Sequence, residues 1–361
     1  MTKPLVLIMA GGTGGHIFPA QAVAKALHEA GWDIAWLGTA DRMEARLVPQ
    51  FGWSFYPIQV AGLRGKGIRS IFTAPVMLIR AAWQARQLIT QLRPALVLGF
   101  GGYASGPGGL AAWLAGVPLL IHEQNAVAGS TNRLLAKLAK KVMVAFPQAF
   151  AGSRKQVLLG NPVRAELLGC RQDRPDNSEL RILVIGGSLG ARALNELLPG
   201  QFTSLAEHGP IAIRHQTGEA MLATVQTAYQ PLQQKGIAVE VTAFIDDMAG
   251  AYRWADVVVC RAGALTVSEL AAAGLAAIFV PLPTAIDDHQ TANALSLTSH
   301  DAGWLVPQSQ LTEPGIVPIL AACIKDKNVL QRRAENARRQ ALPNATAEVV
   351  VLCRQVTGRA V

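Results

Sequence analysis

Cysteine is scarce in this chain, and its few cysteines do not stand at a metal-binding or redox spacing. The 361 residues include four, Cys170, Cys260, Cys323 and Cys353, and none belongs to a C-x-x-C pair. This pattern argues against a disulfide framework or a zinc site and suits reduced thiols packed inside a cytosolic protein. We therefore expect no bound metal, because the nearest other cluster, at positions 287–289, is typical of an acidic helix start.

Charged residues are also few, and the acidic ones are outnumbered. Only 16% of the residues are charged and 50% are hydrophobic, which excludes extensive disorder and fits heavily buried parallel strands. The 33 lysines and arginines exceed the 24 acidic residues and leave a net charge of +9, which predicts an anionic partner. Basic clusters at 64–86 and 133–141 lack the aromatic interleaving of a nucleic-acid surface. We therefore expect a phosphorylated molecule or an acidic membrane rather than nucleic acid.

The sequence also lacks a clear targeting or membrane-spanning run. The apolar run at 5–10 is short for a signal peptide and leads into glycines rather than a cleavage site. Residues 262–283 are about long enough to cross a bilayer, but Ser268, Glu269 and two glycines suit a soluble helix followed by a buried strand. Because 361 residues exceed what one core usually supports, we expect a cytoplasmic protein of two domains without a transmembrane helix.

Glycine, by contrast, gathers at two matching places, one in each half of the chain. The apolar run 5–10 leads into GGTGGH at 11–16, and the run 182–185 leads into GGSLGA at 186–191. Each reads as a buried strand that turns into a helix N-terminus, where exposed backbone N–H groups favour phosphate. Neither turn is a dinucleotide fingerprint, because Ile17 stands where a third small residue is required and Ser188 stands where a glycine would be. Tight connections that bind no ligand are the alternative interpretation.

Short apolar strands alternate with helical stretches along both halves. This repetition predicts an α/β protein with two Rossmann-like, doubly wound parallel-sheet domains facing a cleft. We expect the boundary just after the Gly-Asn-Pro at 160–162, which gives domains 1–163 and 164–341, with a C-terminal helix at about 342–361 packing back on the first. The predicted strands are Leu5–Ala10, Ile34–Leu37, Leu96–Leu98, Leu119–His122, Lys141–Val144, Ile182–Ile185, Ile211–Gln216, Val239–Thr242, Val257–Cys260 and Ala277–Val280.

The loops of this pattern carry a set of motifs that resembles the MurG family of bacterial glycosyltransferases. In chain order they are GGTGGH, GLRGKG, GGYxSGP, HEQN, GNPVR, GGSxGA, FIDDM and RxGALTVSE, and the match runs from Gly11 to Asn293. The resemblance implies a GT-B fold and an inverting hexosyltransferase. Such an enzyme moves N-acetylglucosamine from UDP-N-acetylglucosamine to the C4 hydroxyl of lipid I and makes lipid II, in the last cytoplasmic step of peptidoglycan precursor synthesis.

The resemblance also implies a location and partners. The first domain would hold the lipid-linked acceptor and the anionic membrane surface, and the second would hold the UDP-sugar without a cofactor. The protein would be peripheral on the cytoplasmic face of the bacterial inner membrane, with cell-wall synthesis and division proteins as candidate partners. A UDP-sugar epimerase and a non-catalytic nucleotide-sugar-binding subunit are the rival functions, and neither needs a lipid acceptor.

By the same resemblance, individual residues receive roles in binding. Glu269 binds the ribose, with a helix N-terminal carboxylate as the alternative reading, and Ile245 meets uracil through its backbone. His289 departs from the pair of glutamines that the family has there, which leaves its role open. The acceptor-side residues are Gly102, Tyr103, Ser105 and His122. The donor-binding residues are Thr13, Gly14, Gly15, Asn125, Arg164, Ser188, Ile245, Ala264, Leu265, Thr266, Val267, Ser268, Glu269 and Gln290.

His16 is the candidate general base, because it closes the first glycine turn at a helix start, where the local field favours a neutral imidazole. A neutral imidazole can accept the proton of the acceptor hydroxyl. A histidine that only hydrogen-bonds the turn is the alternative. Glu123 and His122 are rival bases, and the sequence does not choose among the three.

An apolar stretch with flanking cations resembles the membrane-docking patch of the family. It contains Ile71, Val76, Leu78, Ile79 and Trp83, and the cations are Arg64, Lys66, Arg69, Arg80 and Arg86. An apolar face ringed with cations suits an anionic leaflet. A helix packed on its own domain would explain the apolar positions equally well.

Overall fold

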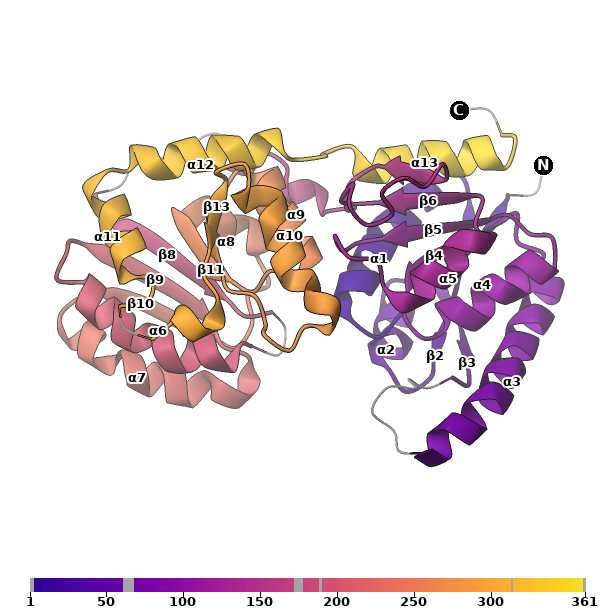
Figure 1. Cartoon of the computed structure of the whole chain (residues 1–361), viewed down its shortest axis with the longest axis horizontal. Helices are drawn as coiled ribbons and strands as arrows, with labels where there is room; N and C mark the ends of the chain where they lie inside the picture. The colour runs from indigo at the N-terminus through magenta and orange to yellow at the C-terminus, as the bar shows by residue number, and fades with distance from the viewer. Residues whose placement is uncertain (1–2, 61–67, 172–177, 188–189, 313, 360–361) are drawn as a thin grey trace. The chain divides into compact units, whose positions relative to one another are not determined.

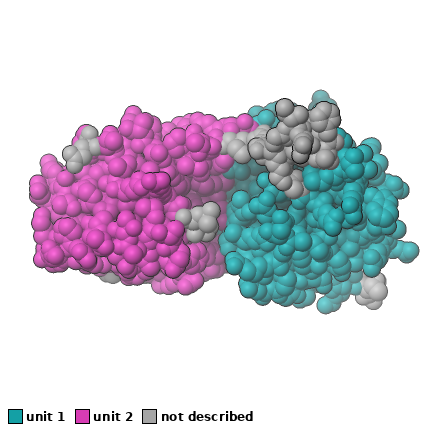
Figure 2. All heavy atoms as spheres, turned by 90° about the horizontal axis from the view of Figure 1, so that it is seen from below, with its two compact units in different colours: residues 1–163, 342–361 teal, residues 164–341 magenta. Residues whose placement is uncertain are grey.

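The chain forms two compact units, each of which is described by itself. The structure is a computed structural model that describes residues 3–60, 68–171, 178–187, 190–312 and 314–359, without the side chains of 68–74 and 286. Unit 1 comprises residues 1–163 and 342–361, and unit 2 comprises residues 164–341 (Figure 2). The basic motif GLRGKG at 62–67 and Ser188 lie outside the described residues.

Unit 1 contains a seven-stranded sheet in which every recorded pairing is parallel. The strand order is β3-β2-β1-β4-β5-β6-β7. Figure 1 labels β2 to β6 of this sheet. The chain thus starts near the middle of the sheet, winds to one edge and then to the other, as in doubly wound folds. The strands are β1 Leu5–Ala10, β2 Asp33–Thr39, β3 Ser54–Ile58, β4 Leu96–Gly101, β5 Leu119–Glu123, β6 Lys141–Val144 and β7 Gln156–Leu158.

Helices cover both faces of this sheet because the side chains of each buried strand alternate between two cores. Val6 and Ile8 of β1 join the core beneath α1, α2 and α13, whereas Leu7 and Met9 join the core beneath α3, α4 and α5. The C-terminal helix α13 packs against α1 and buries Val349 in the first of these cores. The helices are α1 Gly14–Glu29, α2 Met43–Gln50, α3 Ile68–Leu92, α4 Ser105–Leu114, α5 Ser130–Leu138 and α13 Ala345–Val356.

Unit 2 repeats the plan with a six-stranded parallel sheet of order β10-β9-β8-β11-β12-β13. Its strands are β8 Leu180–Ile185, β9 Ile211–Gln216, β10 Ala238–Thr242, β11 Val257–Cys260, β12 Ala276–Phe279 and β13 Gly303–Leu305. Its α-helices are α6 Arg192–Leu205, α7 Leu222–Gln234, α8 Met248–Trp254, α9 Ala264–Ala273, α10 His289–Thr298, α11 Val317–Lys325 and α12 Asn328–Arg339. Short 3₁₀ turns occupy Ala165–Leu167, Glu219–Met221, Ile286–Asp288 and Gln308–Gln310.

The strand orders locate one switch point in each sheet. Successive connections leave β1 and β4 in opposite directions along the sheet of unit 1, and β8 and β11 do the same in unit 2. Ligands of doubly wound folds bind beyond the carboxyl ends of the strands at such a point. The two glycine turns follow β1 and β8, so each lies at a switch point.

All strands predicted from the sequence are present, and β3, β7 and β13 were missed. Each missed strand lies at an edge of its sheet, where one neighbour is lacking and the apolar signal is weak. Pro57 within β3 also argued against a strand, but an edge strand tolerates a residue that cannot donate a ladder hydrogen bond. No helix among the described residues is long and apolar enough to span a membrane. In the same residues no cluster of three His, Cys, Asp or Glu side chains could hold a metal ion.

Candidate functional site

The first glycine turn leads into α1 and presents an open helix N-terminus. Gly12 has a backbone φ of +87°, which glycine adopts without strain, and Thr13 is the extended N-cap residue. The side chain of Thr13 does not cap the helix, and the first turn of α1 carries no acidic residue. Thr13 and Gly15 are exposed. The turn can therefore present backbone N–H groups to an anion.

His16 closes this turn, and one hydrogen bond defines its tautomer. Its Nδ1 lies 3.0 Å from the carbonyl oxygen of Gly11. Because a carbonyl oxygen only accepts, Nδ1 carries the proton and Nε2 of the neutral ring has the lone pair. The ring lies against Gly101, where an added Cβ would stand 3.1 Å from Nε2. The arrangement gives a neutral His16 the tautomer that a general base needs.

The acceptor-side residues of the β4–α4 loop divide into exposed and buried ones. Gly102 packs on the first turn so closely that an added Cβ would stand 2.6 Å from the Gly11 carbonyl oxygen. Tyr103 is 46% exposed, and its ring centroid lies 5.7 Å from the guanidinium carbon of Arg42. Ser105 is buried, and its Oγ donates within the loop, 2.8 Å from the Gly101 carbonyl oxygen. Tyr103 can thus touch a substrate, whereas the Ser105 hydroxyl orders the loop.

His122, at the end of β5, is buried with both ring nitrogens occupied. Its Nε2 donates to the carbonyl oxygen of Gly160 at 2.9 Å, and its Nδ1 lies 3.3 Å from the side-chain nitrogen of Gln124. The ring stacks on Phe100. Burial lowers the pKa of His122 to about 4, so the ring is neutral at physiological pH. These contacts suit a residue that joins β5 to the segment at Gly160 better than a base.

Glu123 is also buried, and its carboxylate binds the loop that follows it. One oxygen accepts the backbone N–H of Asn125 at 3.0 Å, and the other accepts the backbone N–H of Gly129 at 3.0 Å. The second oxygen also accepts from Asn132 Nδ2 at 2.9 Å. Glu123 therefore sets the position of Asn125, a predicted donor contact, and the geometry favours His16 over Glu123 as the base.

The second glycine turn follows β8 and is braced by the next loop of the sheet. Gly187 and Gly190 have φ values of +84° and +74°, and an added Cβ at Gly190 would stand 1.9 Å from the Thr217 carbonyl oxygen. The side chain of Gln216 donates to the Gly187 carbonyl oxygen at 3.2 Å. Only glycine fits at position 190 next to the Thr217 carbonyl, and Ser188 lies outside the described residues.

A network of buried polar side chains holds the Thr217 loop that packs against this second turn. Asn195 Nδ2 donates to the Thr217 carbonyl oxygen at 2.9 Å, and Asn195 Oδ1 lies 3.0 Å from His215 Nε2. His215 Nδ1 in turn lies 2.9 Å from the hydroxyl of Tyr229. Burial lowers the pKa of His215 to about 3 and raises that of Tyr229, so both side chains are neutral. The network is fully hydrogen-bonded and rigidifies the loop that Gly190 contacts.

Glu269, the predicted ribose ligand, lies on α9 with two partners. Its Oε2 accepts from the hydroxyl of buried Tyr252 at 3.2 Å, and its Oε1 lies 3.5 Å from a guanidinium nitrogen of Arg164. Burial raises the pKa of Glu269, and the charge of Arg164 opposes that shift. Arg164 is exposed on its other side and can also reach an anion. Two predicted donor residues are thus in direct contact.

The other predicted donor residues of unit 2 stand at carboxyl ends of strands. Ile245 follows β10, and α9 begins directly after β11 with the segment 264–268, of which Ala264 and Val267 are buried. Gln290 lies in the first turn of α10, and its Oε1 accepts the backbone N–H of Leu282 at 3.0 Å. Before it, Asp287 and Asp288 have positive φ values of 53° and 48°, which non-glycine residues rarely adopt.

The patch predicted for membrane docking lies on α3 and is exposed where it is described. Val76, Leu78, Ile79 and Trp83 are 69%, 38%, 70% and 60% exposed, whereas Ala81, Ala85 and Ile89 of the same helix are buried in the core. Arg80 and Arg86 are exposed beside them. Arg64 and Lys66, and the side chains of Ile71 and Arg69, lie outside the described part of the structure. From residue 75 onward, the apolar residues of α3 thus form one face that packs against the core and one that is exposed.

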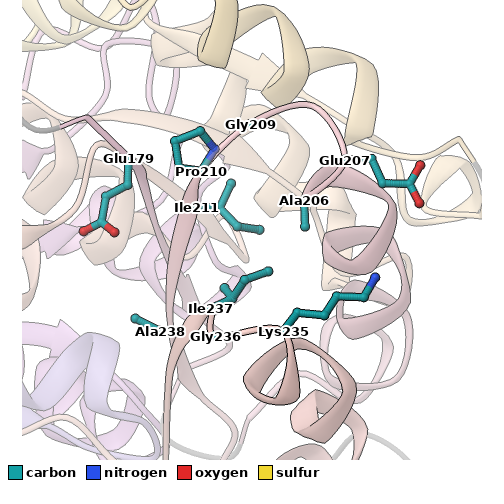
Figure 3. A pocket seen from close by; sticks show the side chains of 10 residues that line it. All are labelled: Glu179, Ala206, Glu207, Gly209, Pro210, Ile211, Lys235, Gly236, Ile237 and Ala238. Atoms are coloured by element: carbon teal, nitrogen blue, oxygen red, sulfur yellow. The ribbon is translucent and has the colours of Figure 1, made fainter.

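A separate hollow of about 410 Å³ lies in unit 2 at the amino ends of the strands, opposite their carboxyl ends (Figure 3). It is lined by residues that precede or begin β8, β9 and β10, among them Glu179, Pro210 and Ile237. None of the predicted site residues lines it. Because sites of doubly wound sheets lie at the carboxyl ends of strands, this hollow is not the candidate site.

Sequence reasoning missed Glu44, Asn132 and Tyr252, which bind the first glycine turn, Glu123 and Glu269. It also missed His215, which hydrogen-bonds to Asn195 beside the second turn. Glu44 lies in α2 and is 1% exposed. Its position four residues before buried Val48 places it on the apolar face of that helix, which is the signal that could have found it. Asn132, Tyr252 and His215 make their contacts with residues 9 to 20 positions away, which no local sequence pattern predicts.

Comparisons with known proteins relate the chain to glycosyltransferases over most of its length. The model of the glycosyltransferase family 28 N-terminal domain matches residues 6–144, and that of the family 28 C-terminal domain matches residues 181–349. A UDP-N-acetylglucosamine–N-acetylmuramyl-(pentapeptide) pyrophosphoryl-undecaprenol N-acetylglucosamine transferase of Aeromonas hydrophila is 53% identical, covering 99% of this chain and 98% of the relative. The protein of the same name from Shewanella denitrificans is 50% identical over 98% of this chain and 97% of its own.

The crystal structure of Acinetobacter baumannii MurG is similar to this chain along its whole length. It is 43% identical, with a TM-score of 0.83 over 98% of this chain and 99% of that one. The predicted GT-B fold with two parallel α/β sheets is confirmed, and so is the family that the motifs indicated. The chain therefore belongs to glycosyltransferase family 28, among the relatives of the MurG enzymes.

Proposed function

We propose that this protein transfers N-acetylglucosamine from UDP-N-acetylglucosamine to an undecaprenyl-pyrophosphoryl N-acetylmuramyl-pentapeptide, the lipid I acceptor, and so forms lipid II for peptidoglycan synthesis. The observation that carries the proposal is the end-to-end match, 53% identical over 99% of the chain, to a relative named for this transfer. The site residues support it, because both switch points carry turns suited to phosphate and one of them carries an oriented histidine.

Unit 2 supplies the donor contacts in this proposal. Glu269 accepts hydrogen bonds from the ribose hydroxyls, and Tyr252 keeps its carboxylate in place. Arg164 and the turn around Ser188 bind the diphosphate, and the backbone at Ile245 pairs with uracil. Gln290 reads hydroxyl groups of the sugar. In unit 1, contacts of Thr13, Gly14, Gly15 and Asn125 with the donor sugar and its pyrophosphate are part of the same proposal.

The proposed reaction is a single displacement with inversion at the anomeric carbon. Nε2 of His16 takes the proton of the acceptor C4 hydroxyl while that oxygen bonds to the anomeric carbon. The bond from the anomeric carbon to the UDP oxygen breaks, and the electron pair leaves with UDP. Arg164 and helix N-terminal N–H groups stabilise the charge that develops on the diphosphate.

We further propose that unit 1 attaches peripherally to the anionic cytoplasmic face of the inner membrane through the exposed face of α3. Val76, Ile79 and Trp83 would enter the headgroup region, and Arg80 and Arg86 would meet anionic lipids. The proposed lipid-linked acceptor would be presented at this membrane face. Partners among cell-wall synthesis and division proteins stay a prediction.

The activity is tested with UDP-N-acetylglucosamine and a short-chain, water-soluble analogue of lipid I. The expected result is the disaccharide product and free UDP in equal amounts, formed only when both substrates are present. Isomerisation of the donor without acceptor would instead identify an epimerase. Binding of the donor without turnover would identify a nucleotide-sugar-binding subunit.

A further inference from the structure

The peptide group between Gly11 and Gly12 is held from both sides by functional groups. Its carbonyl oxygen accepts the hydrogen bond from His16 Nδ1 at 3.0 Å. Its N–H, contributed by Gly12, donates to Oε2 of Glu44 at 2.9 Å. One planar amide therefore connects a carboxylate to the imidazole of the proposed base.

The Glu44 carboxylate is buried and dedicated to this region. It is 1% exposed, and its second oxygen, Oε1, accepts from the backbone N–H of Thr39 at 3.1 Å and from the Thr39 hydroxyl at 2.6 Å. Within the described part of the chain, no lysine, arginine or histidine forms an ion pair with it. The hydrogen bonds recorded for this buried carboxylate all come from the strand end at Thr39 and from the glycine turn.

Glycines around the carboxylate show that the turn is built to admit it. A Cβ added at Gly11 would overlap Glu44 Oε1, and one added at Gly38 would stand 2.7 Å from both Glu44 Cγ and Phe55 Cε2. Gly12 has the positive φ that directs its N–H toward Glu44. Phosphate binding alone does not require a glycine at position 38, which lies on β2.

We propose that Glu44 is a positioning residue that acts on His16 through the Gly11–Gly12 peptide. A carboxylate on the N–H side polarises the amide and makes its carbonyl oxygen a stronger acceptor. That oxygen keeps the proton on Nδ1, so the lone pair on Nε2 faces the acceptor hydroxyl. It also stabilises the imidazolium that forms when Nε2 takes the hydroxyl proton. The inference rests on the proposed function, in which His16 is the base.

The alternative is a purely structural role, in which Glu44 only fastens the turn. The tautomer of His16 separates the two roles. If Glu44 acts through the peptide, removing its charge changes both the tautomer and the turnover rate. If it only fastens the turn, the folded Glu44→Gln variant keeps the His16 tautomer of the unmutated protein.

The experiment compares Glu44→Gln with Glu29→Gln, which removes the same charge from an exposed position at the end of α1. Steady-state kinetics with the water-soluble acceptor give kcat and the donor KM, and ¹⁵N NMR of histidine-labelled protein gives the His16 tautomer. We expect Glu44→Gln to lower kcat roughly 10- to 100-fold, as loss of a charged hydrogen bond does, with the donor KM within about threefold. We also expect part of the His16 population to move to the Nε2–H form. Glu29→Gln should match the unmutated protein in both readouts.

Three outcomes overturn the inference. The first is an Nε2–H tautomer of His16 in the unmutated protein, which needs no variant and so remains decisive if Glu44→Gln does not fold. The second is a folded Glu44→Gln protein with unchanged kcat. The third is a folded Glu44→Gln protein with an unchanged tautomer. The His16→Ala variant tests the proposed function separately. Full turnover in His16→Ala would show that His16 is not the base. Loss of turnover in His16→Ala, together with normal kinetics of Glu44→Gln, would refute only the role of Glu44.

Discussion

At the scale of single residues, hydrogen bonds distinguish the three potential bases of the site. His16, His122 and Glu123 are all potential bases by type, yet both nitrogens of His122 and both oxygens of Glu123 are engaged by neighbouring groups. Only for His16 does the fold pair one ring nitrogen with a carbonyl and turn the other toward a glycine. Burial and hydrogen bonding therefore distinguish residues that composition treats alike.

His16→Ala should lower kcat by about 100- to 10,000-fold and leave the donor KM within a few-fold, because a general base acts in the transition state. Steady-state kinetics with varied donor and saturating soluble acceptor measure both constants. Circular dichroism controls for folding. A kcat within a few-fold of the unmutated value, together with a raised donor KM, would show that His16 binds substrate and does not take the proton.

Glu269→Ala should weaken UDP binding by about 1.5 to 3 kcal/mol, the value of a hydrogen bond to a charged group. Titration calorimetry with UDP and with 2′- and 3′-deoxy-UDP measures the loss. Tyr252→Phe is the matched variant, since it keeps the buried ring but removes the hydroxyl that donates to Glu269, and a smaller loss is expected. The ribose assignment fails if both deoxy analogues bind the unmutated protein as tightly as UDP.

At the scale of elements, α3 carries apolar residues that pack in the core and others that are exposed and proposed to bind the membrane. Ala81, Ala85 and Ile89 are buried in the core of unit 1, and Val76, Ile79 and Trp83 on the other face are mostly exposed. Burying one such side chain at a membrane interface contributes about 1.5 to 3 kcal/mol, and each nearby cation contributes about 1 kcal/mol. A few of them suffice for reversible attachment without insertion.

Replacing Val76 and Ile79 by serine should reduce binding to liposomes that contain anionic lipid, while activity on the soluble acceptor and thermal stability persist. Co-sedimentation measures binding, which should also fall with added salt. Leu158→Ser, at an exposed leucine of edge strand β7, is the control and should bind normally. Equal binding of the unmutated protein to neutral and anionic liposomes would contradict the electrostatic part of the proposal.

At the scale of the whole molecule, each unit has its own hydrophobic core and its own buried neutral histidine. His122 lies in unit 1 and His215 in unit 2, and burial lowers their pKa values to about 4 and about 3. In the unfolded chain these histidines have a pKa near 6.5. Between that pH and their pKa values in the folded protein, the histidines of the unfolded chain bind protons and those of the folded protein do not. Stability therefore falls as pH decreases through this window.

As the pH is lowered from about 6 to about 4, we expect each of these histidines to reduce the free energy of unfolding by about 1.4 kcal/mol per pH unit. Above pH 7 the two histidines should not make the free energy of unfolding depend on pH. Urea unfolding at pH 7, 6 and 5, followed by circular dichroism, measures the slope before most carboxylates titrate. His215→Gln should remove the part of this pH dependence that comes from unit 2. The same slope in that variant would show that His215 does not bind a proton on unfolding.

Much of the architecture could be predicted from the sequence, because buried parallel strands are continuous apolar runs and each central run leads into a turn or helix start. The glycine turns and motif loops were found for the same reason, since strand-to-helix connections are local in the chain. The edge strands β3, β7 and β13 were not found. Their pairing depends on a neighbouring strand, which compensates for a proline in β3 and for only three residues in β7 and β13.

The sequence by itself determined the fold class, the family and the positions of the candidate site loops in the chain. Only the tertiary structure decided which side chains support these loops. Glu44 reaches the Gly11–Gly12 peptide, and Tyr252 reaches Glu269, through contacts between separate elements. Hydrogen bonds of this kind depend on distances of about 3 Å between residues far apart in sequence, and no periodicity or spacing along the chain encodes them.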